Sequence, residues 1–89
     1  MARLDYDFEG VEGQAASLIT GDILFELGLK YSIGRDVEIC LVSAHKWFNL
    51  AASKGHEGAR GHRADIAREL SRADVSKAQR LARAWLRGE

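Results

Sequence analysis

Apolar and polar positions recur with a helical period along most of this chain of 89 residues. Residues 22 to 32 carry two neighbouring apolar stripes, which predicts a helix that is covered on more than one side. Residues 41 to 54, residues 57 to 70, and the stretch from Ser71 to about residue 86 each place small or apolar side chains on one face. The pattern therefore predicts four helices and an all-α fold.

Glycines punctuate this pattern, and one of them stands inside a predicted helix. Gly34 and Gly55 follow the first and second helices, where a left-handed residue commonly ends a helix. Gly28 lies between Leu27 and Leu29, and glycine in a helix interior costs about 1 kcal/mol relative to alanine. Close approach of another helix would compensate for that cost, so we expect tightly packed helical hairpins.

A spaced set of small, aromatic and apolar residues runs through residues 24 to 59. Its members are Leu27, Gly28, Tyr31, Gly34, Val37, Ala44, Trp47, Ala51, Ala52, Gly55 and Ala59. This spacing resembles one Sel-one-like repeat, the short αα-hairpin repeat related to tetratricopeptide repeats. The resemblance implies two antiparallel helices per repeat, stacked into a superhelix that scaffolds other proteins, usually without catalysis.

The resemblance also assigns a role to each part of the set. The Leu27–Gly28 pair would let the two helices approach closely, Tyr31 and Trp47 would fill the hairpin core, and the two consecutive alanines would seat the following helix. Residues 22 to 55 would then form the repeat hairpin and residues 56 to 87 a modified capping hairpin. Together with the preceding residues they make one helical-repeat domain over 14 to 87, because a chain of this length has room for a single core.

Three positions depart from the family pattern. Asp36 stands where a second loop glycine is usual, and aspartate tolerates a left-handed conformation better than most residues. Glu38 and Cys40 replace the usual proline and helix-capping aspartate. We therefore expect the turn to form and the second helix to begin without its normal side-chain cap.

The composition is that of an ordered, soluble chain: 46% of the residues are apolar, 29% are charged and none is proline. The single Cys40 excludes an intramolecular disulfide, and the first residues lack the pattern of a signal peptide. The apolar runs are far shorter than the roughly 20 residues that span a bilayer. A cytoplasmic protein without a membrane segment is expected.

The formal net charge is zero, but the two ends of the chain differ in sign. Residues 1 to 13 are predominantly acidic and have no helical period, so they are predicted to be an irregular segment. Residues 60 to 87 are predominantly basic. This asymmetry fits either a tail that folds onto its own domain or a surface that meets a charged partner.

The residues that could carry catalysis do not form a recognisable constellation. The spacing of His45, His56 and His62 puts no two of them on one helical face, which argues against a zinc site. His45 is expected to be partly buried and hydrogen-bonded, and Cys40 to be a structural thiol. No glycine-rich loop follows a strand. We therefore expect no enzyme, no cofactor and no metal site.

The favoured function is a small helical-repeat module for protein–protein interaction, an adaptor or scaffold whose partner is another protein or a second copy of itself. Phe25 and Leu29 have no evident cover within the chain, so the N-terminal segment or a second subunit is expected to bury them. The alternative is a nucleic-acid-binding protein that uses Arg80, Arg83 and Arg87. A solvated charged face is the favoured interpretation of that arginine line, since no aromatic residue lies among its members.

Overall fold

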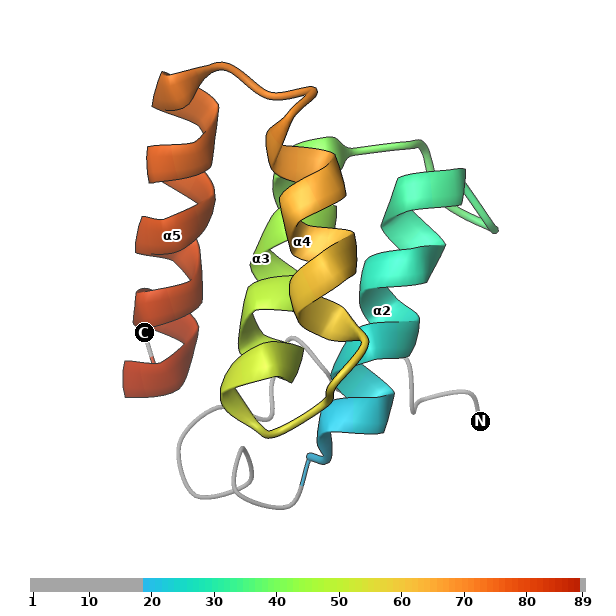
Figure 1. The fold of residues 1–89 in the computed structure, drawn as a ribbon, viewed down its shortest axis with the longest axis vertical. Helices are drawn as coiled ribbons and strands as arrows, with labels where there is room; N and C mark the ends of the chain where they lie inside the picture. The colour runs from blue at the N-terminus through green and yellow to red at the C-terminus, as the bar shows by residue number, and fades with distance from the viewer. Residues whose placement is uncertain (1–18, 89) are drawn as a thin grey trace.

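The computed structural model of the chain describes residues 19 to 88, and within them it contains four helices and no strand (Figure 1). The helices are α2 (Gly21–Ile33), α3 (Leu41–Ser53), α4 (Ala59–Ala67) and α5 (Arg72–Arg87). Each helix runs opposite to the one before it (Figure 1). The predicted all-α fold is confirmed, whereas the predicted irregular segment 1 to 13 and the start of the predicted domain lie outside the described residues.

Local capping determines where α2 begins and ends. The Thr20 hydroxyl accepts a hydrogen bond from the backbone N–H of Ile23 at 3.2 Å, which satisfies one of the free donors of the first turn. Gly34 takes a left-handed conformation with φ of 77° and donates its N–H to the carbonyl of Lys30. Asp36 has a φ of 64°, as expected of the residue that replaces a loop glycine.

The start of α3 lacks a side-chain cap, as the sequence predicts. Cys40 occupies the N-cap position in an extended conformation, and its side chain makes no capping hydrogen bond. The helix ends at Ser53, and Gly55 follows with a φ of 92°. The N-terminal end of α3 therefore relies on tertiary packing rather than on a side-chain cap. Its C-terminal end is followed by a glycine in the left-handed conformation.

Helix α4 is shorter than the helix predicted over residues 57 to 70. Its regular part ends at Ala67, and in the next turn the N–H groups of Glu69 and Leu70 bond to carbonyls three residues back, Leu70 to Ala67 at 3.2 Å. The chain then becomes extended at Ser71, whose hydroxyl accepts from the N–H of Asp74 at 3.0 Å. The predicted cap of α5 is thus confirmed, and its extended backbone stops α4 from continuing.

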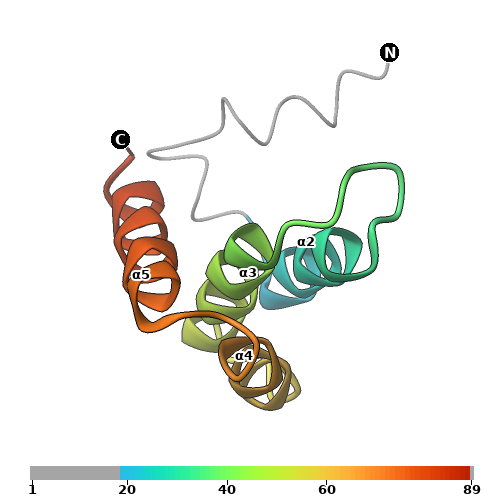
Figure 2. The same ribbon diagram turned by 90° about the horizontal axis from the view of Figure 1, so that it is seen from above.

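Helix α3 lies in the middle of the four and packs against α2, α4 and α5 (Figure 2). On one side the Trp47 ring meets Trp85 of α5 edge to face, with ring centroids 5.8 Å apart. On another side the ring of Phe48 lies directly over Gly28 of α2. The close approach predicted at Gly28 is confirmed, and a buried aromatic ring occupies the space. The buried apolar residues are Ile19, Leu24, Ala44, Trp47, Phe48, Leu50, Ala51, Ala59, Ala78, Ala82 and Trp85.

The second half of the chain differs from a tightly closed hairpin. Helices α4 and α5 run in opposite directions, but the main packing partner of α5 is α3 (Figures 1 and 2). Small residues make this contact possible, because Ala78 and Ala82 are almost fully buried and bring α5 close to α3. The two helices that follow residue 56 therefore both use α3 as their platform.

Candidate binding groove

A polar line on α3 forms one wall of an open groove. Asn49 and Ser53 lie four residues apart and so share one face of the helix. Asn49 is half-buried, and the Ser53 hydroxyl donates to the carbonyl of Leu50 at 2.7 Å. Ala52 lies beside them, and its small side chain leaves the wall shallow.

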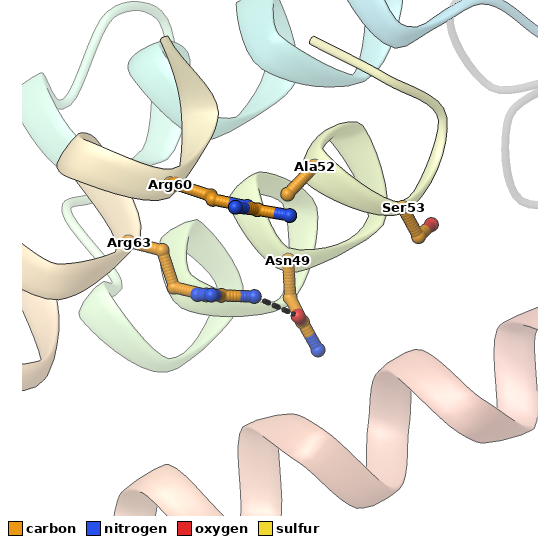
Figure 3. A pocket seen from close by; sticks show the side chains of 5 residues that line it. All are labelled: Asn49, Ala52, Ser53, Arg60 and Arg63. Atoms are coloured by element: carbon orange, nitrogen blue, oxygen red, sulfur yellow. Dashed lines mark hydrogen bonds between the residues drawn. The ribbon is translucent and has the colours of Figure 1, made fainter. Parts of the chain in front are cut away.

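The other wall comes from the first two turns of α4. Arg60 and Arg63 extend from α4 toward α3 and lie over Asn49 and Ala52 (Figure 3). Nη1 of Arg63 donates to Oδ1 of Asn49 at 2.7 Å, so this arginine is held in place across the groove. These residues and Ser53 enclose a volume of about 260 Å³. A second hollow of similar size adjoins it, sharing Ala52 and Arg60.

Neither arginine of the groove has a carboxylate partner among residues 19 to 88. The ion pairs in this part of the chain join Arg35 to Glu26, His56 to Asp22 and Arg68 to Asp65. The second hollow includes Glu57 in its wall, yet this carboxylate forms no ion pair with either groove arginine. The groove therefore carries uncompensated positive charge.

His45 lies on α3 one turn before Asn49 and is only 3% exposed. Its Nδ1 has no hydrogen-bond partner within the described residues. The prediction that His45 is hydrogen-bonded is therefore wrong for Nδ1. Burial lowers the pKa of His45, and the positive charge of Arg63 lowers it further. A neutral imidazole therefore lies beneath the basic groove.

This burial predicts a pH-dependent stability. As the pH falls below about 6.5, the usual histidine pKa, the unfolded chain binds a proton at His45 that the folded chain excludes, so the free energy of unfolding falls. One such proton limits the slope to about 1.4 kcal/mol per pH unit. Chemical denaturation of the parent and of His45→Gln at pH 7.5 and 5.5 should show a smaller loss in the variant. An equal loss in both proteins would rule out His45 as the source.

The other two histidines are brought together by the turn between α3 and α4. His56 stacks on the Phe25 ring with centroids 4.1 Å apart, and His62 meets the same ring edge on at 4.9 Å. Nε2 of His56 also lies 3.6 Å from a carboxylate oxygen of Asp22. Two histidine rings therefore cover part of Phe25, which the sequence pattern did not indicate, whereas the expected burial of Phe25 by the N-terminal segment lies outside the described residues. Leu29 is likewise only partly exposed.

The remaining residues predicted to bind a partner lie on α5. Arg80, Arg83 and Arg87 are all exposed, and none of them lines the groove. Arg60 and Arg63 were not predicted as a pair from the sequence. Their spacing of three residues in a predicted helix was a usable signal, but it could not show that they face Asn49 rather than an acidic partner.

Within residues 19 to 88 no group of three or more histidine, cysteine, aspartate or glutamate side chains is placed to hold a metal ion. Cys40 is half-buried, and hydrogen bonding with the side chain of Ser43 lowers its pKa. No described helix combines the length and apolarity that crossing a bilayer would require. The groove itself contains guanidinium and amide N–H groups, which are suited to binding an anion rather than to acid–base chemistry, whereas the Ser53 hydroxyl already donates to the Leu50 carbonyl.

The described residues define a small all-α unit with an open basic groove between α3 and α4. Comparisons with protein-family models, curated proteins and solved structures found no match to the chain. The likeness to a Sel-one-like repeat therefore stays a prediction from residue spacing.

Proposed function

We propose that this chain is a small, non-catalytic helical module that binds another protein. The observation that carries the proposal is the open groove whose walls are Asn49 and Ser53 of α3 and the two arginines of α4. Grooves between packed helices commonly receive an extended or helical segment of a partner, and charged groups at their edges guide association. A cytoplasmic adaptor or scaffold remains the setting that the sequence predicts.

The Sel-one-like interpretation is part of this proposal. It is supported by the antiparallel arrangement of α2 and α3 (Figure 1) and by Gly28, which leaves space for the Phe48 ring between them. The left-handed conformations of Gly34 and Asp36 suit the short connection that such a hairpin requires. In this interpretation the groove lies between the second helix of the repeat and the helix that follows it.

The alternative function, nucleic-acid binding, would use the exposed arginines of α5. Arg80 and Arg83 are exposed, but Trp85, the one aromatic residue of that helix, is buried against Trp47. No exposed ring therefore accompanies these arginines along α5, and base stacking on aromatic side chains is a main source of single-strand affinity. Protein binding in the groove is the function that the described surface favours.

A photo-reactive residue, placed first in the groove and then on the arginine face of α5, distinguishes protein binding in the groove from nucleic-acid binding on α5. Ser53 lines the groove, whereas Ser76 is exposed on the arginine face of α5, so the two serines form a matched pair of sites. With p-benzoylphenylalanine at Ser53, we expect one defined protein to be cross-linked in the source cell. The same residue at Ser76 should not capture that protein.

Two results would contradict the proposal. One is capture of DNA or RNA from Ser76 with no protein captured from Ser53, which would favour the alternative. The other is an identical mixture of proteins from both positions, which would indicate nonspecific contact. Circular dichroism of both substituted chains checks that the helices are retained.

A further inference from the structure

The two groove arginines form a like-charged pair on one face of α4. Residues three apart on a helix are neighbours, so Arg60 and Arg63 repel each other. The nearby acid Asp65 is already paired with Arg68. Helix α4 also begins without a side-chain cap or an acid in its first turn, which adds the positive end of the helix dipole to the same region. An anion in the groove would reduce the repulsion between the two arginines and would interact favourably with the helix dipole.

The hydrogen-bonding groups of the groove also favour an anion. Asn49 turns its carbonyl oxygen toward Arg63 and its nitrogen away from it (Figure 3). The Ser53 hydroxyl donates its hydrogen to the Leu50 carbonyl. The Asn49 oxygen is thus already engaged by Arg63, and the Ser53 hydroxyl has no hydrogen left to donate. The groups that can still donate to an anion are the remaining N–H groups of both guanidinium groups. Arg63 is oriented by Asn49, which lowers the entropy that binding would otherwise cost.

From this arrangement we infer that the groove is a carboxylate-binding site, in which Arg60 and Arg63 hold an acidic side chain of an extended peptide segment and Asn49 positions Arg63. The inference rests on the proposed function and names the chemistry of its partner. A guanidinium group matches the two oxygens of a carboxylate, and the adjoining hollow, whose wall includes Glu57, gives a second position for an uncharged residue of the peptide.

The surface around the groove favours a peptide over a nucleic acid. A nucleic acid is normally held by a longer run of cations, often with stacked aromatic rings. Among residues 19 to 88, two arginines and no aromatic residue line the groove, and the chain as a whole has a formal net charge of zero. A single acidic side chain flanked by uncharged residues matches this charge, because Glu57 lies in the wall of the adjoining hollow.

The test uses the full chain and a fluorescently labelled peptide of alternating glutamate and alanine, measured by anisotropy at low salt. Arg60→Gln/Arg63→Gln should bind the peptide about threefold to tenfold more weakly, since each partly exposed ion pair contributes a factor of about 1.4 to 5. The matched control is Arg80→Gln/Arg83→Gln, which removes two arginines at the same spacing from α5. We expect the affinity of this control to stay within about twofold of the parent. A peptide with glutamine in place of glutamate should bind neither the parent nor either variant.

A second variant tests the site without removing an arginine. Asn49→Asp places a carboxylate next to Arg63, where the Asn49 amide oxygen already accepts a hydrogen bond at 2.7 Å. This internal anion should occupy the site, so peptide affinity should fall about tenfold while the melting temperature is kept or raised. Retained affinity in Asn49→Asp would contradict the inference even if the double glutamine variant failed to fold.

Other occupants give distinct results, and each would overturn the inference. Inorganic phosphate or duplex DNA that displaces the peptide at equal anion concentration would indicate a general anion site. Peptide binding that appears only after the acids Asp5, Asp7, Glu9 and Glu12 are made neutral would assign the groove to the chain's own first residues. Cross-linking of a protein from Ser53, combined with no binding of the acidic peptide, would leave the proposed function standing and refute this inference alone.

Discussion

Replacing Trp47 with alanine is expected to lower the free energy of unfolding by about 3 to 5 kcal/mol, the usual cost of deleting a large buried aromatic side chain. Trp47 is 5% exposed and lies where α3 meets α5, with its ring edge to face against Trp85. Leu24 and Leu50 belong to the same buried cluster. A domain of this size has a total stability of only about 5 to 15 kcal/mol, so the variant should be close to unfolding at room temperature.

Urea denaturation followed by far-ultraviolet circular dichroism measures this change. The matched control is Leu86→Ala on α5, because the Leu86 side chain is 51% exposed. Its effect should stay within about 0.5 kcal/mol, as for most exposed positions. If Trp47→Ala melted within a degree or two of the parent, Trp47 could not hold α3 and α5 together.

The ends of the helices were largely predictable because they depend on neighbouring residues. Ser71 caps α5 through Asp74, and Gly34 ends α2 in a left-handed conformation. Each of these interactions joins residues that are at most four apart, so the amino-acid types alone indicate them. The shorter α4 was missed because the N–H groups of Glu69 and Leu70 bond to carbonyls three residues back instead of four, a change that the residue types alone did not indicate.

The packing partners of the helices were not predictable in the same way. Periodicity identifies the apolar face of α5, but it cannot tell whether Ala78 and Ala82 meet α3 or α4. The cover of Phe25 also depends on distance in space, since His56 and His62 reach it only after the chain has turned between α3 and α4.

The groove shows the same division between local and tertiary information. Arg60 and Arg63 could be placed on one helix face from their spacing, and Asn49 could be placed on the polar face of α3. Two further features depend on how α4 lies across α3. Arg63 bonds to Asn49, and no carboxylate of residues 19 to 88 pairs with either arginine. Uncompensated charge of this kind is therefore a property of the folded chain.

The contact between α2 and α3 gives the second large prediction, because it depends on a missing side chain. A Cβ atom built on Gly28 would lie 2.5 Å from Cδ1 and from Cε1 of the Phe48 ring, far closer than two carbon atoms normally approach. Phe48 is fully buried and also contacts Phe25, with ring centroids 5.4 Å apart. The ring cannot move away without disturbing the packing of α2 and α4, so the space at Gly28 is required.

Gly28→Leu is accordingly expected to cost about 3 kcal/mol or more, at the upper end of the range for overpacked cores. Gly28→Ala is the informative smaller change, because alanine should gain about 1 kcal/mol in helix propensity and lose it to the clash with Phe48. A double-mutant cycle with Phe48→Leu measures the clash directly. Removing the ring should make Gly28→Ala less destabilising, or stabilising, with a coupling of about 0.5 to 3 kcal/mol. Strict additivity of the two changes would show that Phe48 is not what requires glycine at this position.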